Sequence, residues 1–168
     1  MTAAVLLLGA VTAERLAELW WARLNTAALL VGGAQEFAPR HYPAIVLVHA
    51  LWLGSLWLFG WTHPLSSIWL AIFLTLQVLR AWILTTLEHR WTTRIIVLPG
   101  APLVAGGPYR FLSHPNYFVV IGEIAALPLC LGLPWLALGF STANAVILAI
   151  RIRAENAALM ESRHVECA

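Results

Sequence analysis

Long apolar stretches dominate this sequence and constrain its fold more than any other feature. A transmembrane helix needs about 20 mostly apolar residues. Stretches near that length occur at residues 3–21, 43–61, 65–87, 116–132 and 135–152. Because lipid offers the backbone no hydrogen bonds, such stretches form helices. We therefore predict an all-α integral membrane protein with about five transmembrane helices, organised as a single membrane domain over the whole chain.

The composition supports a membrane protein and excludes several other classes. Charged residues make up only 11% of the 168 residues, against about 25% in soluble domains. The net charge of +2 and the scattered arginines argue against nucleic-acid binding. Two cysteines, Cys130 and Cys167, and histidines without ligand spacing predict neither a disulfide framework nor a metal site. No basic residue precedes the first apolar stretch, so we expect a span there rather than a secretory signal.

The break between the last two stretches predicts a helical hairpin. Pro128 and the sequence Gly132-Leu-Pro134 interrupt an apolar run that is too long for one crossing. With five spans and the N-terminus outside, the connections expected on the inner side carry the arginines outside the spans, as the positive-inside rule requires. These are Arg23, Arg40, Arg90, Arg94, Arg110, Arg151, Arg153 and Arg163.

The expected outer turns, residues 62–64 and 131–133, contain no Arg. This agreement between charge and hydropathy places the connection at residues 88–117 on the cytoplasmic side. Every basic residue is Arg and every acidic residue is Glu, a bias that we interpret as bacterial. We therefore expect a multi-pass protein of the bacterial inner membrane.

The inner connection at residues 88–117 is the strongest candidate for a functional site. Its polar end, Gly107–Tyr117, combines turn-forming Gly and Pro with a histidine, an arginine, an asparagine and two tyrosines. Long structured loops are usually functional, and the backbone groups freed at such turns can bind a nucleotide-like ligand. His114-Pro115 also fits an alternative in which it only begins a helix at the membrane surface.

Three further charged residues are candidates for chemistry. Arg151 and Glu155 are four residues apart and therefore share one helix face, where the alternative is a simple ion pair. Glu123 lies inside the fourth predicted span, which makes it a functional candidate, although a structural partner such as Arg80 explains it equally well. Gln77 and Asn144 are most simply interhelical hydrogen-bonding residues.

The sequence Leu103-Val-Ala-Gly-Gly-Pro-Tyr-Arg-Phe-Leu-Ser-His-Pro-Asn-Tyr117, followed by Arg151-Ile-Arg-Ala-Glu155, resembles the isoprenylcysteine carboxyl methyltransferase family. That family's pattern is L-V-x-x-G-P-Y-x-x-x-x-H-P-x-Y with a late R-x-x-x-E. The similarity covers residues 88–163. The sequence departs from the pattern at Ser113, where an Arg often precedes His-Pro, and at Asn156, where a second Glu often follows.

The resemblance implies S-adenosylmethionine as methyl donor, bound near the cytoplasmic face by the inner loop and the C-terminal helix. Arg151 would face a lipophilic acceptor, and Glu155 would contact the amino group of the donor. If a general base is used, His114 and Glu123 are its candidates. The donor site would be lined by Ala101, Pro102, Leu103, Val104, Tyr109, His114, Pro115, Asn116, Tyr117 and Glu155.

The short chain, the Arg151–Glu155 tail and the segment His89–Arg94 are most similar to a small bacterial branch associated with type III polyketide synthases. That branch implies O-methylation of phenolic or enolic lipids such as alkylpyrones or alkylresorcinols, with membrane lipids as surroundings. Alternatives of the same class are carboxyl methylation of a prenylcysteine and N-methylation of a lipid headgroup. A non-catalytic membrane scaffold or transporter and a nicotinamide-dependent membrane reductase are alternatives of other classes.

Overall fold

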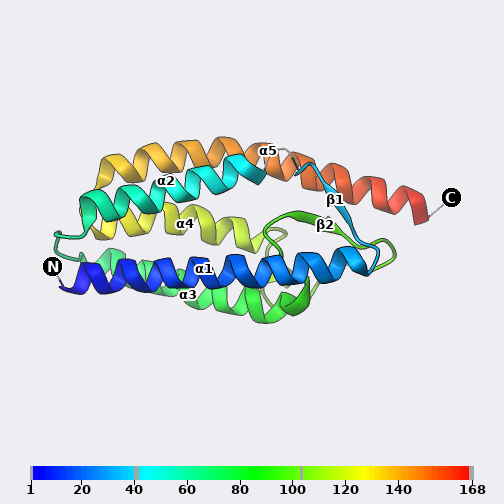
Figure 1. Ribbon diagram of the computed structural model, residues 1–168, viewed down its shortest axis with the longest axis horizontal. Coiled ribbons are helices and arrows are strands. Elements are labelled where there is room, and N and C mark those ends of the chain that lie inside the picture. Colours follow the sequence, from blue (N-terminus) through cyan, green and yellow to red (C-terminus); the bar gives the residue numbers. More distant parts are fainter. Residues whose placement is uncertain (1, 40–41, 103, 167–168) are drawn as a thin grey trace.

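The computed structural model describes residues 2–39, 42–102 and 104–166, with only the backbone described for Thr2 and residues 156–166. Within these residues, five α-helices form an elongated bundle and two short strands form a ribbon (Figure 1). The α-helices are α1 (Thr2–Val31), α2 (Tyr42–Gly60), α3 (Ser67–Leu87), α4 (Pro115–Cys130) and α5 (Pro134–Glu166). The strands are β1 (Gln35–Phe37) and β2 (Ile95–Val97), and the 3₁₀-helices are η2 (Glu88–Arg90) and η3 (Gly107–Arg110).

The connections are sorted between the two ends of the bundle. The start of α1, the α2–α3 turn and the α4–α5 turn lie at one end, whereas the ribbon and the end of α5 lie at the other (Figure 1). At the first end, the Ser66 amide donates a 2.9 Å hydrogen bond to the Cys130 carbonyl and so joins the two turns. This separation of the turns from the longer connections is the arrangement that the distribution of arginines predicts.

The predicted helices are confirmed, including the hairpin that turns at Leu131–Leu133. Of the described segments, three are long and apolar enough to cross a membrane, namely Tyr42–Gly60, Ser67–Arg90 and Pro134–Glu155. The α4 helix has 16 residues, or about 24 Å, which is less than the roughly 30 Å of a hydrocarbon core. The α1 helix continues to Val31 and carries three charged residues within its first 18. Five crossings therefore remain a prediction for α1 and α4.

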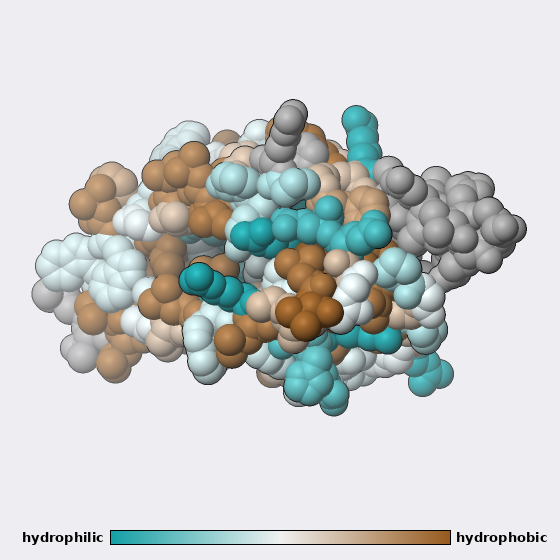
Figure 2. All heavy atoms as spheres, turned by 45° about the vertical axis from the view of Figure 1, so that its right-hand side comes forward, coloured by the Kyte–Doolittle hydropathy of each residue, from teal (hydrophilic) through white to brown (hydrophobic). Residues whose placement is uncertain are grey.

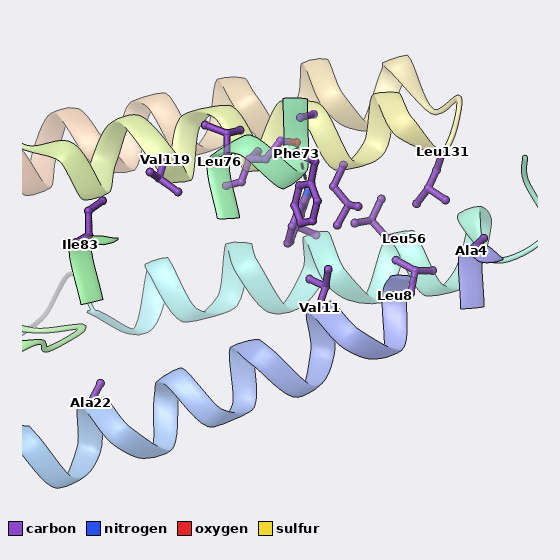
Figure 3. Packing of buried hydrophobic residues seen from close by; sticks show 14 of the residues in the cluster. Ala4, Leu8, Val11, Ala22, Leu56, Phe73, Leu76, Ile83, Val119 and Leu131 are labelled. Carbon is purple, nitrogen blue, oxygen red and sulfur yellow. Dashed lines mark hydrogen bonds between the residues drawn. The ribbon is translucent and has the colours of Figure 1, made fainter. Parts of the chain in front are cut away.

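Interdigitated apolar side chains hold the helices together. Leu8 of α1, Leu56 of α2 and Phe73 of α3 are completely or almost completely buried, and they converge with Leu131 at the end of α4 (Figure 3). In lipid, such packing stabilises a bundle through van der Waals contact and interhelical hydrogen bonds, because lipid chains are as apolar as the side chains.

The antiparallel ribbon is a feature that the apolar pattern did not predict. Gln35 pairs with Val97 and Phe37 with Ile95, so the connection after α1 is fastened to the segment after α3. Asn25, which is buried in α1, also holds the segment between α3 and β2. It donates hydrogen bonds of 3.1 and 2.9 Å to the carbonyls of Glu88 and Trp91. The polar end of the bundle is thus a structured layer.

Candidate active site

The start of α4 positions the histidine and the second tyrosine of the polar segment. Pro115 occupies the first helical position, where its fixed φ favours a helix and its missing N–H costs nothing. His114 precedes it as the N-cap residue, and its ring stacks on that of Tyr117 with the centroids 5.1 Å apart. The His114 side chain thus has a defined neighbour at the start of α4, and its role in chemistry stays a prediction.

The second half of the site comes from α5. The Tyr117 hydroxyl donates a hydrogen bond to the Glu155 carboxylate and accepts one of 3.0 Å from Arg151 Nε. The Nδ1 atom of His114 lies 4.0 Å from the other Glu155 oxygen. The structure thus brings His114, Tyr117, Arg151 and Glu155 together across the α4–α5 interface, and we call these four residues the HYRE cluster.

Tyr109, in the 3₁₀-helix η3, feels the charge of the same carboxylate. Burial raises the pKa of the Tyr109 hydroxyl to about 12, and the negative charge of Glu155 contributes to that increase. The phenol therefore stays protonated at neutral pH and remains a hydrogen-bond donor. The charge of Glu155 on the C-terminal helix therefore acts on Tyr109 as well as lying near His114.

A glycine fixes the loop that carries Tyr109 against α3. Gly107 has φ of +53°, and a Cβ atom placed there would come within 2.4 Å of the Thr86 hydroxyl and 3.2 Å of Trp82 Nε1. Only glycine combines this left-handed backbone with so close an approach. The turn residues of the sequence therefore have a structural purpose, which is to set the loop on the end of α3.

The remaining described residues of the predicted donor site lie in two places, at the start of α4 and in the connection between β2 and η3. Asn116 lies at the start of α4, and its Oδ1 atom is buried without a hydrogen-bond partner among the described residues. The Ala101 amide bonds to the Leu98 carbonyl at 3.2 Å, and the Pro102 carbonyl accepts a 2.7 Å hydrogen bond from Arg90. These contacts bind Ala101 and Pro102 to residues 90 and 98 of the same connection. Neither contact joins them to the HYRE cluster. Val104 is half-buried nearby in sequence, and Leu103 lies outside the described residues.

Glu123 lies about two helical turns further along α4, in a separate group of charges. Both of its oxygens pair with Arg80 of α3, with 2.8 Å between Arg80 Nε and Glu123 Oε1. Arg15 of α1 lies 3.0 Å from the same Oε1. Arg80 also donates hydrogen bonds of 3.0 and 3.1 Å to Glu18. The predicted partnership with Arg80 is confirmed, and a catalytic role for Glu123 stays a prediction without support from its contacts.

The same interhelical region contains a hydrogen bond from an amide to a carboxyl group. Gln77 of α3 donates a 2.7 Å hydrogen bond to Glu14 of α1, as expected of an interhelical polar residue. Together, these contacts link α1, α3 and α4 through polar side chains deep in the bundle.

The residues that surround a small cavity next to Arg151 were not predicted from the sequence. A small cavity is bordered by Glu36 and Phe37 of β1, by Tyr42 at the start of α2, by Arg94 before β2 and by Arg151. These residues come from two connections, from the start of α2 and from helix α5, which look unrelated in the sequence. The β-branched run Ile95-Ile96-Val97 is the one signal of the ribbon that joins them, and three residues are too few to predict a strand. Figure 2, with this end turned forward, shows hydrophilic residues gathered over it.

Comparison with known proteins adds a family and two relatives. Residues 69–161 match the profile of the isoprenylcysteine carboxyl methyltransferase (ICMT) family, which includes all of the HYRE cluster. The chain is 43% identical over 162 residues to the uncharacterized protein YpbQ of Bacillus subtilis, covering 93% of this chain and 96% of that protein. It is 26% identical over 138 residues to an uncharacterized protein of Haemophilus influenzae, covering 79% and 80% of the two chains. No solved structure matches significantly.

Proposed function

The chain belongs to the isoprenylcysteine carboxyl methyltransferase family of membrane methyltransferases, and from this premise we propose that it is an S-adenosylmethionine-dependent O-methyltransferase. Its acceptor is a lipophilic molecule in the bilayer, a phenolic or enolic lipid such as an alkylpyrone or alkylresorcinol. The observation that carries the proposal is the HYRE cluster, in which polar residues separated by 34 to 38 positions share hydrogen bonds. A scaffold would not need this convergence of one histidine, one arginine, one tyrosine and one glutamate.

The residues near the cluster fit the chemical groups of the donor. The carboxylate of Glu155 is a suitable partner for an ammonium group, and the phenol of Tyr109 is a suitable donor to a carboxylate. The unpartnered Oδ1 of Asn116 is a buried acceptor, which needs a donor such as an exocyclic amine to offset its loss of water. When bound, S-adenosylmethionine supplies an electrophilic methyl group attached to a positively charged sulfur.

Arg151 is the residue that we assign to the acceptor. Its guanidinium is permanently charged, so it can hold an ionised enol or phenol oxygen by a charge-assisted hydrogen bond. In the transfer, a lone pair of that oxygen forms the new C–O bond while the C–S bond breaks and its electron pair moves to sulfur. Enzyme groups mainly align the reactants and exclude water.

An acceptor that arrives protonated needs a base, and His114 is the candidate within the cluster. A neutral imidazole nitrogen would take the hydroxyl proton and release it to water. An alkylpyrone enol is acidic enough to reach the site already ionised, so the base matters most for resorcinols. Their phenolic hydroxyl ionises well above neutral pH.

The proposed location follows from the two reactants. The donor is water-soluble and approaches the polar end of the bundle from the cytoplasm, whereas the acceptor moves laterally from the inner membrane of the bacterium. Because such lipids are products of type III polyketide synthases, we propose a functional link to an enzyme of that class. An integral membrane fold allows both reactants to meet without removing the alkyl tail from lipid.

Donor binding is the first test. Titration of S-adenosylhomocysteine into the detergent-solubilised protein should give measurable heat, and Glu155→Gln should weaken the affinity about tenfold, because it removes one charge-assisted hydrogen bond. Arg153→Gln, an exposed change on the same helix, is the matched control and should bind normally. Absence of heat with both S-adenosylmethionine and S-adenosylhomocysteine would contradict the proposal.

Acceptor identity is the second test. The family's name favours an alternative substrate, the carboxylate of a prenylcysteine. Lipids extracted from strains with and without the gene should differ by one methyl group on a phenolic or enolic lipid. A difference confined to a prenylated thioether, or to a lipid amine, would instead support the alternative acceptor while leaving methyl transfer intact.

A further inference from the structure

The cavity beside Arg151 is lined by residues that suit an aromatic anion. Phe37 of β1 and Tyr42 of α2 supply rings, Ile45 and Ile95 supply aliphatic surface, and Arg94 and Arg151 supply positive charge. Against these two arginines stands one carboxylate, that of Glu36. The lining therefore carries a net positive charge within a partly apolar wall, a combination that binds planar aromatic anions through charge pairing and ring stacking.

Arg94 is held at this cavity by two interactions that a ligand could replace. Its Nη1 atom lies 3.0 and 3.1 Å from the two oxygens of Glu36, and its Cζ atom lies 4.7 Å from the centre of the Tyr42 ring. The side chain of Arg94 is 41% exposed, so this ion pair is partly screened by water. The guanidinium thus covers the face of Tyr42 from the water side without being locked there.

Tyr42 itself is fixed in place. Thr93 donates a 3.2 Å hydrogen bond to the Tyr42 hydroxyl, which ties the start of α2 to the strand connection that carries Arg94. The cavity has room for about one water molecule as it stands. A ring can therefore occupy it only if Arg94 moves off the face of Tyr42.

Arg151 joins this cavity to the HYRE cluster. It lines the cavity, while its Nε atom donates a hydrogen bond to Tyr117, which is bonded to Glu155 in turn. One residue therefore separates the proposed donor residues from the ribbon. An acceptor oxygen bound to Arg151 from the ribbon side would lie next to the donor site, as methyl transfer requires.

We propose that the cavity between the β1–β2 ribbon, the start of α2 and Arg151 is the headgroup site for the acceptor. An anionic enol or phenol ring binds against Tyr42, and its oxygens replace Glu36 as the partner of Arg94. Glu36 thereby acts as an internal competitor that occupies Arg94 until an acceptor arrives. This inference rests on the proposed function and names the residues that select an ionised ring.

The simpler interpretation is a diagonal cross-strand ion pair that only stabilises the ribbon. Glu36 pairs with Ile96 in the register, so Arg94 is its diagonal neighbour. The two interpretations predict different effects of substitutions at Glu36 and Arg94 on acceptor affinity. If the pair is only structural, removing either charge weakens the ribbon, and both substitutions act in the same direction. If Glu36 competes with the acceptor, the two substitutions act in opposite directions.

The experiment measures the affinity of a long-chain hydroxy-alkylpyrone for the detergent-solubilised full chain by calorimetry. Arg94→Gln should raise the dissociation constant about tenfold, and Glu36→Gln should lower it about threefold, since it frees the guanidinium. Neither change should alter the affinity for the methyl ether of the same pyrone, which has no anionic oxygen. Arg153→Gln should change neither affinity.

The possible outcomes separate this inference from the proposed function. If both substitutions weaken pyrone binding, or neither changes it, the headgroup site is wrong. If S-adenosylhomocysteine binds but the pyrone does not, the site is also wrong, and methyl transfer to another acceptor stands. If neither ligand binds, both proposals fail. Unchanged S-adenosylhomocysteine affinity in Arg94→Gln and Glu36→Gln verifies that each variant is folded.

Discussion

Arg80 shows how strongly a single residue can depend on its partners in this bundle. Its side chain is 4% exposed and lies between the carboxylates of Glu18 and Glu123. A guanidinium in such surroundings is stable only because both carboxylates compensate for the lost hydration. The same carboxylates would in turn be buried without a counter-ion if the arginine were absent.

The first prediction concerns this ion pair. Arg80→Met should destabilise the protein by about 3–5 kcal/mol, because it leaves buried carboxylates without their partner. The double variant Arg80→Met/Glu123→Met should be more stable than Arg80→Met, since it removes one of the two carboxylates left without Arg80, while Glu18 still pairs with Arg15 at 2.8 Å. Thermal unfolding in detergent measures both. A double variant less stable than the single one would contradict the pairing.

The second prediction concerns the titration of Tyr109. Its pKa is raised from 10.0 to about 12, mainly by burial, so the folded state holds this proton more tightly than the unfolded state does. The resulting stability is present below pH 10 and is lost as the pH rises toward 12. The ultraviolet absorbance of tyrosinate should therefore include a component near pH 12 that Tyr109→Phe removes. If Tyr109→Phe left the amplitude of that component unchanged, the component would belong to another tyrosine and the assignment to Tyr109 would be wrong.

At the scale of elements, the loop before α4 depends on its contact with α3. Gly107 is the point of contact, because its positive φ and the proximity of Thr86 both exclude a side chain. Gly106, its neighbour, has an ordinary φ of −86° and open space where a Cβ would lie. The two adjacent glycines therefore form a matched pair for experiment.

The third prediction uses this pair. Gly107→Ala should move η3 away from α3 and displace Tyr109 from Glu155, which lowers the affinity for S-adenosylhomocysteine about tenfold or more. Gly106→Ala should leave the affinity close to that of the wild type. Calorimetry of the two variants under identical conditions makes the comparison. Equal affinities would mean that the position of the loop does not matter for donor binding.

The helices could be predicted from the sequence, but the ribbon could not. Apolar length determines a helix in lipid and is visible in the sequence of the long spans, as in Tyr42–Gly60. Strands of three residues carry too little pattern, and their pairing joins residues about 60 positions apart. For this reason His114 and Arg151 could be identified by spacing and resemblance, whereas Tyr42 and Arg94 required the folded chain.

At the scale of the whole molecule, α1 is stabilised in the bundle by the charges that make it a poor isolated span. Glu14, Arg15 and Glu18 prevent α1 from qualifying as a membrane helix by composition. In the bundle, however, Glu14 accepts a hydrogen bond from Gln77, and the other two residues form ion pairs. Arg15 pairs with Glu123, and Glu18 pairs with Arg80. The insertion of α1 therefore depends on helices that follow it in the chain, as a two-stage assembly of transmembrane helices allows.

The last prediction concerns the orientation of the molecule. In a variant without the native cysteines (Cys130→Ser, Cys167→Ser), a cysteine at Thr62 should react with a membrane-impermeant maleimide in intact cells. A cysteine at Arg110 should react only after permeabilisation, because the positive-inside rule places the arginine-rich end in the cytoplasm. Both positions are exposed, so burial does not explain a difference in labelling. Reaction of Arg110→Cys in intact cells would place the HYRE cluster outside, away from the cytoplasmic methyl donor, and would contradict the proposed function.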